Sequence, residues 1–593
     1  ARAWADQKQI KAVMLFLQSH HVSTGLAVRI YKAYGENAIE QVQKNPYQLA
    51  QDIYGIGFRT ADQIARNMGL PFLAPERVAA GLVFALNELT EDGHVYAPRD
   101  AAIRKAAELL EVPVEACEAA IEGLRQTEQI VTESLPTHEG QVEAWYLPPL
   151  YYSEKGAANR LHGMLGSAVS RLRAIRTLDW SSFFERLAQS EDLKLTAQQQ
   201  TAVREALTHK VSILTGGPGT GKTTTLHAVI HALEAIHASY ALASPTGRAA
   251  KRLSEATGRP AQTIHRLLGF KPGTGFLTNE DSPLKADMLI LDEASMLDLV
   301  LFYSVLRALT PDTHLLLVGD VDQLPSVGAG DVLRDLIRSG RLPVTRLATI
   351  FRQAGDSLII TNAHRINQGH MPDLHNGGTD FFLFTAEEPE AAADLLIDVV
   401  QNRIPARFGL HPIEDIQVLS PMYRGALGVG ALNERLQAAL NPPGRTAERL
   451  IGGRLFRVGD KVIQMRNNYD KDVFNGDLGR VQALDFTDQL LRVSVDGRFV
   501  DYDWADTGEL SHAYAISVHR SQGSEYPAIV LPIMTQHYMM LQRNLLYTAI
   551  TRARRLVVLI GSRKAIAMAI RNDKVLHRFS GLAWRLSGQV PPD

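Results

Sequence analysis

VSILTGGPGTGKTTT, residues 211–225, joins a short apolar run to a glycine-rich turn and then to a segment of helical character. The turn fits the pattern G-x-x-x-x-G-K-[ST] from Gly216 to Thr223. Its glycines let backbone amides converge on phosphate oxygens with no Cβ atoms in the way. The start of a helix adds a favourable dipole. The stretch therefore predicts a phosphate-binding loop at the end of a strand in an α/β fold.

The predicted loop carries two side chains suited to a nucleoside triphosphate. Lys222 is expected to neutralise the β- and γ-phosphates, and the Thr223 hydroxyl is the natural ligand for Mg²⁺. A chance glycine-rich turn is the alternative, but it does not explain the strand before the turn and the helix after it. The predicted nucleotide-binding residues of the loop are Gly217, Pro218, Gly219, Thr220, Gly221, Lys222, Thr223 and Thr224.

An acidic pair follows a second apolar run, residues 289–291. Asp292 is suited to hold magnesium, and Glu293 to orient or deprotonate the attacking water. An acidic pair after a strand could instead cap the next helix. Beside the glycine loop, the catalytic interpretation is favoured, and ATP and Mg²⁺ are the predicted cofactors.

Short apolar runs that end in polar or glycine residues recur after residue 193, as at 288–291, 315–318, 416–419 and 529–531. This rhythm is typical of parallel sheets wrapped by helices, in which ligands lie beyond the carboxyl ends of the strands. Residues 451–510 break the rhythm with short strands and tight turns, which predicts a small inserted β-barrel. Residues 1–150 show apolar residues at helical spacing and predict an all-helical N-terminal domain.

Bulk composition limits the remaining possibilities. The chain has 593 residues, enough for about four domains, and its net charge of -2 gives no global basic field for nucleic acid. The single cysteine, Cys117, excludes an intramolecular disulfide framework and fits a reducing cytoplasm. No apolar run is long enough to span a bilayer. Since the chain begins at Ala1 without methionine, we expect residues upstream of it in the natural protein.

The order of motifs between about 193 and 575 resembles that of superfamily 1 helicases, in the RecD-like branch that moves 5′ to 3′. Residues 195–203 resemble the glutamine motif, and 243–250 and 263–268 resemble strand-binding segments. Residues 420–425 resemble the motif that opens the second motor domain. The most diagnostic stretch, AYAISVHRSQGSE at 513–525, contacts both strand and nucleotide in that family. The resemblance implies two RecA-like motor domains with an SH3-like barrel inserted in the second.

The resemblance also implies roles for single residues. Gln199 would contact adenine, Gln323 would sense the γ-phosphate, and Glu525 would face the ribose or the phosphates. Arg352 and Arg552 would stabilise charge on the transferring phosphoryl group, a role that contributes about 10³–10⁵ in rate. The residues expected to contact the strand are Pro245, Thr246, Gly247, Arg248, His265, Arg266, Tyr423, Arg424, Ser517, His519 and Ser521.

Two features of these segments have open alternatives. The rings of Tyr423 and His265 could stack on bases, which is worth about 1–3 kcal/mol per base, or could pack in the core. Residues 270–276, FKPGTGF, predict a hairpin with a tight tip. In RecD-like enzymes such an insertion forms a pin beside the strand path, so we expect it to wedge the duplex. An ordinary surface loop is the alternative.

The front end resembles the long, stand-alone RecD-like proteins. Residues 54–62, YGIGFRTAD, look like a helix-hairpin-helix element whose turn at Gly55 and Gly57 aims backbone amides at a phosphate. A plain helix connection is the alternative. A monomeric, stand-alone protein is expected, because the shorter RecD subunit of the helicase–nuclease complex does not resemble this region.

The expected domain boundaries follow from these patterns. They are 1–150 for the helical domain, 151–192 for a connector, 193–345 for the first motor domain with the hairpin insertion at about 268–286, 346–450 and 511–593 for the second, and 451–510 for the barrel. The predicted function is an ATP-dependent DNA helicase that moves 5′ to 3′ on single-stranded DNA and unwinds single/double-strand junctions. An RNA helicase and a subunit of a larger nuclease complex are the alternatives.

Overall fold

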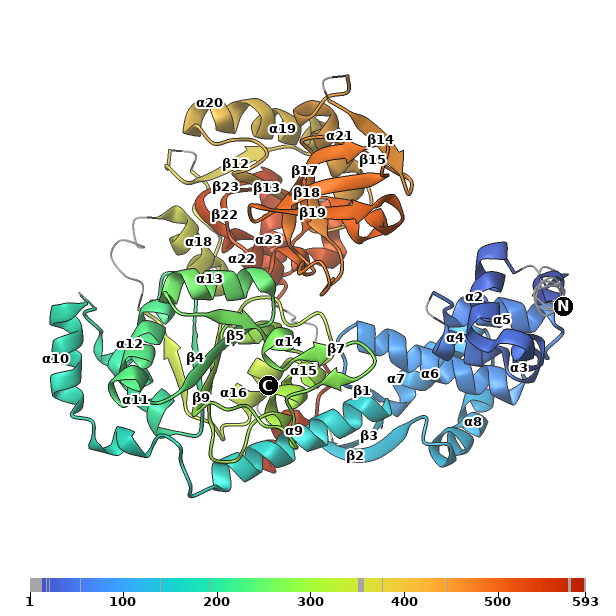
Figure 1. The fold of residues 1–593 in the computed structure, drawn as a ribbon, viewed down its shortest axis with the longest axis horizontal. Coiled ribbons are helices and arrows are strands. Elements are labelled where there is room, and N and C mark those ends of the chain that lie inside the picture. The colour runs from blue at the N-terminus through green and yellow to red at the C-terminus, as the bar shows by residue number, and fades with distance from the viewer. Residues whose placement is uncertain are drawn as a thin grey trace. The chain divides into compact units, whose positions relative to one another are not determined.

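The computed structural model describes residues 13–17, 19–20, 22–53, 55–138, 140–191, 193–349, 357–375, 377–444, 446–573 and 578–590. The chain forms two compact units. The first contains residues 1–156, 328–330 and 578–592, and the second contains 157–327 and 331–577. The nucleotide-binding motifs all fall in the second unit, drawn from teal to red in Figure 1.

The first unit is mainly helical. Its helices bury one continuous core that includes Ile30, Leu82 and Leu110. The helical elements are α2 (Thr24–Tyr34), η1 (Gly35–Asn37), α3 (Ala38–Lys44), η2 (Pro46–Gln48), α4 (Leu49–Asp52), α5 (Phe58–Asn67), α6 (Pro75–Glu91), α7 (Arg99–Leu110), α8 (Val114–Gln126) and α24 (Leu582–Ser587). Helix α9 (Pro148–Gly166) begins in this unit and ends in the second.

The prediction that residues 1–150 are all helical is wrong in one part. Strands β1 (Tyr96–Pro98), β2 (Val131–Thr137) and β3 (Gly140–Tyr146) form an antiparallel sheet in the order β1-β3-β2. The β2–β3 hairpin turns at Gly140, which has a positive φ. Ala144, Trp145 and Tyr146 at the end of β3 are all buried, so both faces of this strand are covered there and the alternation of a half-buried strand is missing.

The second unit begins with helical elements and a parallel sheet. Strands pair side by side in the order β11-β4-β10-β9-β5-β6, and every pair is parallel. The strands are β4 (Val211–Gly216), β5 (Tyr240–Ser244), β6 (Ala261–Thr263), β9 (Met288–Leu291), β10 (His314–Gly319) and β11 (Val344–Leu347). The helical elements are η3 (Arg173–Thr177), α10 (Trp180–Ser190), α11 (Ala197–Thr208), α12 (Lys222–Ala235), α13 (Gly247–Thr257), α14 (Ile264–Leu267), η4 (Ala294–Met296), α15 (Leu299–Arg307) and α16 (Val332–Arg338).

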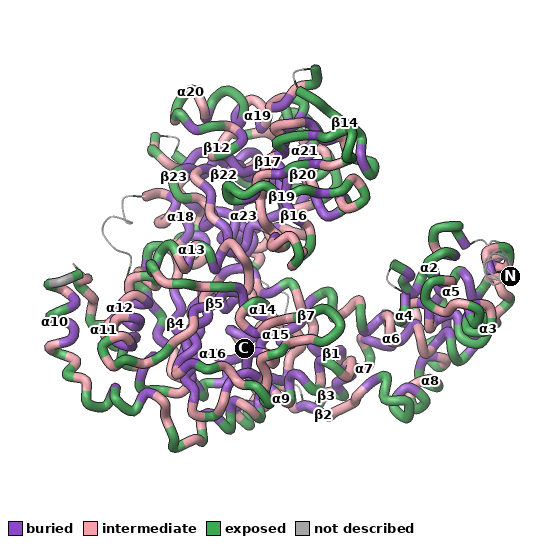
Figure 2. Tube along the Cα trace, viewed as in Figure 1, coloured by how far each residue is buried: buried purple, intermediate pink, exposed green. Residues whose placement is uncertain are grey.

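A second parallel sheet follows, in the order β12-β23-β22-β13-β21. Its strands are β12 (Phe381–Thr385), β13 (Ile416–Ser420), β21 (Ala515–Ser517), β22 (Tyr526–Ile533) and β23 (Ala553–Gly561). The helical elements are α18 (Leu358–Asn367), α19 (Pro389–Asp398), η5 (Val399–Arg403), α20 (Ile404–Phe408), α21 (Val429–Leu440), η7 (His519–Ser521), η8 (Thr535–Met540), α22 (Arg543–Ile550) and α23 (Arg563–Arg571). Strands β4 and β10 of the first sheet are buried along their whole length, as are all but one residue of β22. In Figure 2 the trace is largely purple at β4 and β22. The predicted pair of parallel-sheet domains is confirmed.

A small antiparallel sheet interrupts the second parallel sheet between β13 and β21. It pairs strands in the order β19-β18-β17-β16-β20 over its own buried core. The strands are β16 (Lys461–Gln464), β17 (Leu478–Asp485), β18 (Leu490–Val495), β19 (Arg498–Asp503) and β20 (Leu510–His512), with η6 (Trp504–Glu509) before β20. The preceding hairpin, β14 (Glu448–Ile451) with β15 (Arg454–Arg457), is a separate two-stranded sheet.

The end of the chain differs from the expected boundary at 593. Residues from Arg578 onward belong to the first unit rather than to the second parallel sheet. Arg585 on α24 pairs with Glu154 and with Glu133, and the Gly581 amide donates to the fully buried Glu154 at 2.7 Å. Since a glutamate in a helix is most often exposed, nothing in the residue pattern indicated that Glu154 anchors a distant segment.

Candidate functional site

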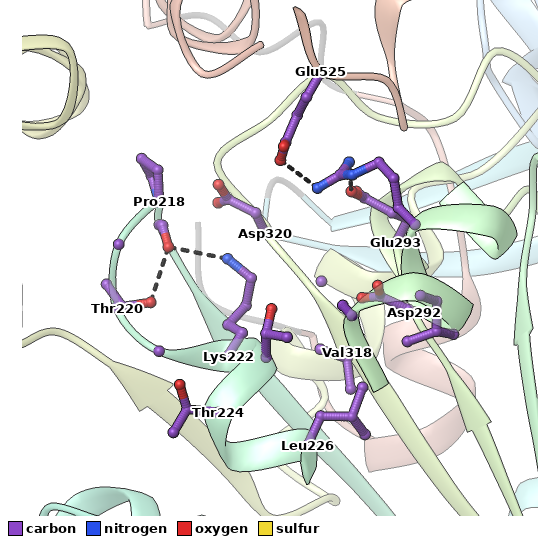
Figure 3. Close-up of a pocket in the computed structure, with 18 of the residues that line it drawn as sticks. Pro218, Thr220, Lys222, Thr224, Leu226, Asp292, Glu293, Val318, Asp320 and Glu525 are labelled. Atoms are coloured by element: carbon purple, nitrogen blue, oxygen red, sulfur yellow. Dashed lines mark hydrogen bonds and ion pairs between the residues drawn. The ribbon is translucent and has the colours of Figure 1, made fainter. Parts of the chain in front are cut away.

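The phosphate loop follows β4 and ends where α12 begins. Gly219 and Gly221 both have positive φ, 71° and 82°, a conformation that costs glycine nothing. The Thr220 hydroxyl donates to the Gly217 carbonyl at 2.9 Å and holds the loop curved (Figure 3). Lys222, the first residue of α12, donates to the carbonyls of Gly216 and Gly217 at 2.5 and 3.0 Å. The loop therefore has the form of a backbone-amide cradle at a helix N-terminus.

Two acidic side chains lie at the ends of the neighbouring strands. Asp292 follows β9, and burial together with the charge of Glu293 raises the pKa of Asp292 to about 6. Asp320 follows β10, and burial raises its pKa as well. The Lys222 ammonium opposes both shifts. Buried carboxylates of this kind are ready to receive a cation, because a positive charge removes the cost of ionising them.

The second parallel sheet supplies the opposite wall. Glu525 and Arg552 lie directly before β22 and β23. The Arg552 side chain is 3% exposed, and its guanidinium donates to the carbonyls of Thr548 and Ser524, both at 3.3 Å. Burial alone would raise the pKa of Glu525, but the guanidinium groups of Arg252, Arg554 and Arg552 outweigh burial and hold that pKa below its usual range.

Both walls line one pocket of about 1130 Å³. The pocket is large enough for a nucleoside triphosphate, and Figure 3 shows Lys222, Asp292, Glu293, Asp320 and Glu525 around it. All eight predicted residues of the loop line it, and so do Gln323 and Arg552. Arg352 lies outside the described residues.

Gln199 is the predicted nucleotide contact that the structure places elsewhere. Its side chain is 1% exposed and completes a capping box at the start of α11, accepting from the Thr196 amide at 3.0 Å. Its amide group donates to the Gly221 carbonyl at 3.3 Å. Gln199 does not line the pocket, whereas Leu193 and Lys194, just upstream, do. In this structure the helix cap and the loop occupy the side chain, and the contact between Gln199 and adenine stays a prediction.

Three residues in or beside the pocket were not singled out by the sequence, and of these only Arg252 lines it. Arg252 on α13 forms ion pairs with Glu525 and with Glu293. Tyr547 on α22 donates to Asp320 at 2.7 Å, and the His364 ring on α18 lies 3.3 Å from the Pro218 carbonyl. No sequence motif could have identified these three residues, because they lie on three different helices. Each helix brings one side chain to the phosphate loop or to an acidic residue of the pocket.

The predicted strand-contact segments of the two sheets adjoin each other. Thr246 caps α13 by accepting from the Ala249 amide at 3.3 Å, and its hydroxyl lies against Gly523. The neighbouring Pro245 and Gly247 are half-buried. These positions bring the end of β5 beside the segment that follows β21, which is the arrangement that one continuous strand path requires.

Four predicted strand contacts are accessible in this structure. Tyr423 is 57% exposed, and its hydroxyl forms a hydrogen bond with the Ser517 hydroxyl at 3.2 Å, in which either group can donate. Arg424 is exposed and His519 is half-exposed. Arg266 is exposed and pairs with Asp472 at 3.3 Å. These side chains remain predictions as strand contacts.

Three others are engaged inside the protein. The Ser521 hydroxyl is fully buried and donates to the Val518 carbonyl at 2.7 Å, so no strand can reach it in this conformation. Arg248 donates to the hydroxyls of Ser524 and Tyr526. The His265 ring lies against Phe270 and Phe276, 5.6 and 5.5 Å from their centres. The ring of the half-buried His265 therefore packs against the hairpin, burial lowers its pKa, and stacking on a base stays a prediction.

The predicted hairpin is present. Strands β7 (Phe270–Lys271) and β8 (Gly275–Phe276) pair antiparallel, and Gly273 and Gly275 at the tip have positive φ. The Phe270 ring also lies 6.1 Å from the ring of Tyr469 in the loop after β16. Whether this hairpin separates strands stays a hypothesis.

The front-end turn has the expected glycine geometry. Gly55 has a φ of 88°, and a Cβ there would lie 2.5 Å from the Arg29 side chain. Gly57 precedes α5 as its N-terminal cap. Both residues are exposed, so their amides are open to solvent. A contact between these amides and a phosphate stays a prediction.

Family models match four parts of the chain. The ATP-dependent RecD2 DNA helicase HHH domain matches residues 6–96, and the ATP-dependent RecD-like DNA helicase SH3 domain matches 432–495. An AAA domain matches 199–329, and the UvrD-like helicase C-terminal domain matches 512–560. The chain is also 35% identical over 591 residues to the ATP-dependent RecD2 DNA helicase of Deinococcus radiodurans, across 97% of this chain and 79% of that protein.

This chain belongs to the RecD-like family of ATP-dependent DNA helicases. The resemblance seen in the motifs is thereby confirmed, including the helix-hairpin-helix front end and the SH3-like insertion. The RecBCD enzyme subunit RecD of Mycobacterium tuberculosis is 34% identical over 434 residues, which covers 66% of this chain and 73% of that subunit. This RecD-like helicase therefore shares more of its length with the RecD2 protein.

The chain is also similar to solved structures of Pif1 helicases. Bacteroides Pif1 bound to ssDNA is 21% identical, with a TM-score of 0.40 over 62% of this chain and 92% of that one. Candida albicans Pif1 is 20% identical, with a TM-score of 0.38 over 63% of this chain and 97% of that one. No helix in the described ranges of this RecD-like helicase is long and apolar enough to cross a membrane.

Proposed function

We propose that this RecD-like helicase moves 5′ to 3′ along single-stranded DNA and separates duplexes at single/double-strand junctions, driven by hydrolysis of Mg²⁺–ATP in the pocket. The observation that carries the proposal is that one pocket is lined from two parallel sheets. Lys222 and the carboxylates come from the first sheet, and Glu525 and Arg552 from the second. Because Arg552 reaches the pocket from the second sheet, hydrolysis of the bound nucleotide is tied to the approach of the two domains.

The residues fit a division of roles at the γ-phosphate. The loop amides and Lys222 hold the phosphates, and Glu293 orients the attacking water. The water oxygen forms a bond to the γ-phosphorus, the bond from that phosphorus to the bridging oxygen breaks, and the water proton passes to Glu293. Arg552 compensates the charge that develops on the departing ADP, and Gln323 reports the presence of the γ-phosphate.

Thr223 and Asp292 would hold Mg²⁺ between the loop and the second strand end. Their fit rests on the donor set, because the hydroxyl at the start of α12 and the buried carboxylate after β9 are oxygen ligands of the kind that Mg²⁺ prefers. When bound, Mg²⁺ withdraws negative charge from the β- and γ-phosphates. In the described part of the chain, no cluster of three or more His, Cys, Asp or Glu side chains forms a metal cage. This agrees with magnesium held chiefly by phosphates and water.

The strand would run over Thr246, Tyr423 and His519, close to the edges where the two sheets adjoin. Tyr423 offers an exposed ring for a base, and hydroxyl groups and backbone amides suit phosphate contacts that read no sequence. We propose that the protein acts as a monomer in the cytoplasm.

Two partial duplexes with identical sequence test the polarity, one with a 5′ single-stranded tail and one with a 3′ tail. We expect ATP-dependent strand separation of the 5′-tailed duplex alone. Separation of only the 3′-tailed duplex would contradict the proposal. A third duplex with an RNA tail compares the response to the 2′-hydroxyl, which distinguishes DNA from RNA at backbone contacts. Lys222→Ala, which removes the phosphate-binding ammonium, serves as the control for separation that does not depend on ATP.

A further inference from the structure

Arg252 connects the water-orienting carboxylate to the opposite wall of the pocket. It lies on α13, and its guanidinium forms ion pairs with Glu525 and, at 3.7 Å, with Glu293. It also donates to the Gly523 carbonyl at 3.4 Å. Figure 3 shows Glu525 and Glu293 with dashed lines that lead to this one guanidinium. Among the residues that the structure describes, no other cation pairs with both carboxylates.

Glu293 has little else to hold its side chain. The only ion pair recorded for it in the described ranges is the one with Arg252. Its backbone has a positive φ of 53°, which places it on a turn between β9 and η4. Glu525, by contrast, is also fixed by Arg554, whose Nε donates to it at 2.7 Å. Arg252 is therefore anchored to the second sheet more firmly than to Glu293, and it draws Glu293 toward that anchor.

The same helix begins at the predicted strand path. Thr246 caps α13, and Arg252 lies six residues further along, about one and two-thirds turns at 3.6 residues per turn. A helix of this length moves as a rigid body. A displacement of its N-terminus by a bound strand is therefore transmitted to the guanidinium in the pocket.

We propose that Arg252 is a positioning residue that restrains Glu293 when no strand is bound, and that strand binding at the N-terminus of α13 releases the restraint. Arg252 thereby makes ATP hydrolysis depend on single-stranded nucleic acid. This inference rests on the proposed function, because it assumes that Glu293 orients the water and that a strand contacts Thr246.

The test compares ATP turnover without and with saturating single-stranded DNA for wild type and Arg252→Gln. Removing one partly exposed ion-pair partner is expected to raise the strand-free kcat by about fivefold. The strand-saturated kcat and the KM for ATP are expected to stay within about twofold, so the stimulation ratio falls. Arg252→Lys keeps the charge but cannot span both carboxylates, and its ratio should lie between those of wild type and Arg252→Gln.

Lys251→Gln is the matched control. It removes one positive charge from the same helix, but Lys251 pairs with Asp496 of the barrel at 2.9 Å and does not line the pocket. Its stimulation ratio should equal that of wild type.

Equal losses of both turnover rates in Arg252→Gln, or an unchanged ratio, would overturn the inference. If the proposed function itself is wrong, the wild type shows no stimulation of ATP hydrolysis by single-stranded DNA, which is a different result from either outcome for Arg252→Gln. Thermal unfolding of each variant separates these outcomes from misfolding.

Discussion

The two parallel sheets of the second unit present opposite edges to the nucleotide pocket. In the first sheet, the phosphate loop, Asp292 and Asp320 follow the carboxyl ends of β4, β9 and β10. In the second sheet, Glu525 and Arg552 precede the amino ends of β22 and β23. The carboxyl ends of the second sheet, at Ser420 of β13 and Ser517 of β21, instead lie beside the predicted strand-contact segments. For the nucleotide, the usual rule that ligands bind at the carboxyl ends of strands therefore describes only the first sheet.

This difference assigns different tasks to the two domains. The first sheet gathers the proposed phosphate-binding and metal-binding groups on neighbouring strands, so under this proposal it holds a nucleotide by itself. The second sheet contributes guanidinium groups that reach the nucleotide only when its amino edge faces the pocket. A rigid rotation of the second domain can therefore withdraw Arg552 without disturbing the phosphate loop. Binding and hydrolysis should then be separable by substitutions on opposite walls.

The strongest way to break this comparison is Arg552→Ala. We expect kcat for ATP hydrolysis to fall by about 10³–10⁵ with saturating single-stranded DNA, because the developing charge loses its compensating guanidinium. Affinity for a fluorescent ATP analogue should change little, since the loop that binds the phosphates lies on the other sheet. Arg555→Ala, an exposed neighbour that does not line the pocket, is the control. Near-normal turnover in Arg552→Ala would show that Arg552, at the amino end of β23, takes no part in ATP hydrolysis.

A second prediction concerns the hairpin, the insertion of the first sheet. Deleting residues 271–275 removes the turn while leaving Phe270 and Phe276 to cover His265. Each base-pair step costs about 1.4 kcal/mol of stacking, which corresponds to about tenfold in rate. We therefore expect unwinding to slow by about tenfold if the tip separates the strands. ATP turnover on single-stranded DNA should be preserved.

The control for the deletion keeps the length of the hairpin. Replacing Pro272 and Thr274 by glycine retains the chain path between β7 and β8 but loosens the turn. Unwinding by the loosened hairpin should fall between that of wild type and that of the deletion. Undiminished unwinding by the deletion would show that the hairpin is an ordinary surface loop.

The sequence predicted best the features that depend on local pattern. The loop at Gly216–Thr223 combines a strand, glycines with positive φ and a helix start within one short stretch, so each part is visible in order. Asp292 and Glu293 follow an apolar run for the same reason. The two parallel sheets and the inserted antiparallel sheet were also predictable, since runs of different length and turn chemistry distinguish them.

The features that the sequence missed depend on contacts between distant elements. Arg252, His364 and Tyr547 look like ordinary helix residues, and only the packing of α13, α18 and α22 around the pocket gives them roles. The same holds for Glu154, which is buried because α24 returns to it. Long-range contacts of this kind leave no periodicity or spacing in a single sequence.

The smallest expected effect concerns Gln199, and it tests whether the domain of the first sheet recognises the adenine base. If Gln199 completes the capping box of α11 as observed, Gln199→Ala leaves the Thr196 amide without its side-chain acceptor, and losing one such hydrogen bond costs about 0.5–1.5 kcal/mol. The midpoint of thermal unfolding should then fall by a few degrees, while the preference for ATP over GTP stays unchanged. If Gln199 instead turns toward the base when a nucleotide binds, the variant loses hydrogen bonds worth about 0.5–1.5 kcal/mol each, and the preference for ATP over GTP weakens.

Gln200→Ala, on the same helix, is the control, because the Gln200 side chain bonds only the Leu195 carbonyl in the described contacts. Measuring kcat/KM for both nucleotides in both variants therefore decides whether the first sheet recognises the base through this side chain or only holds the phosphates.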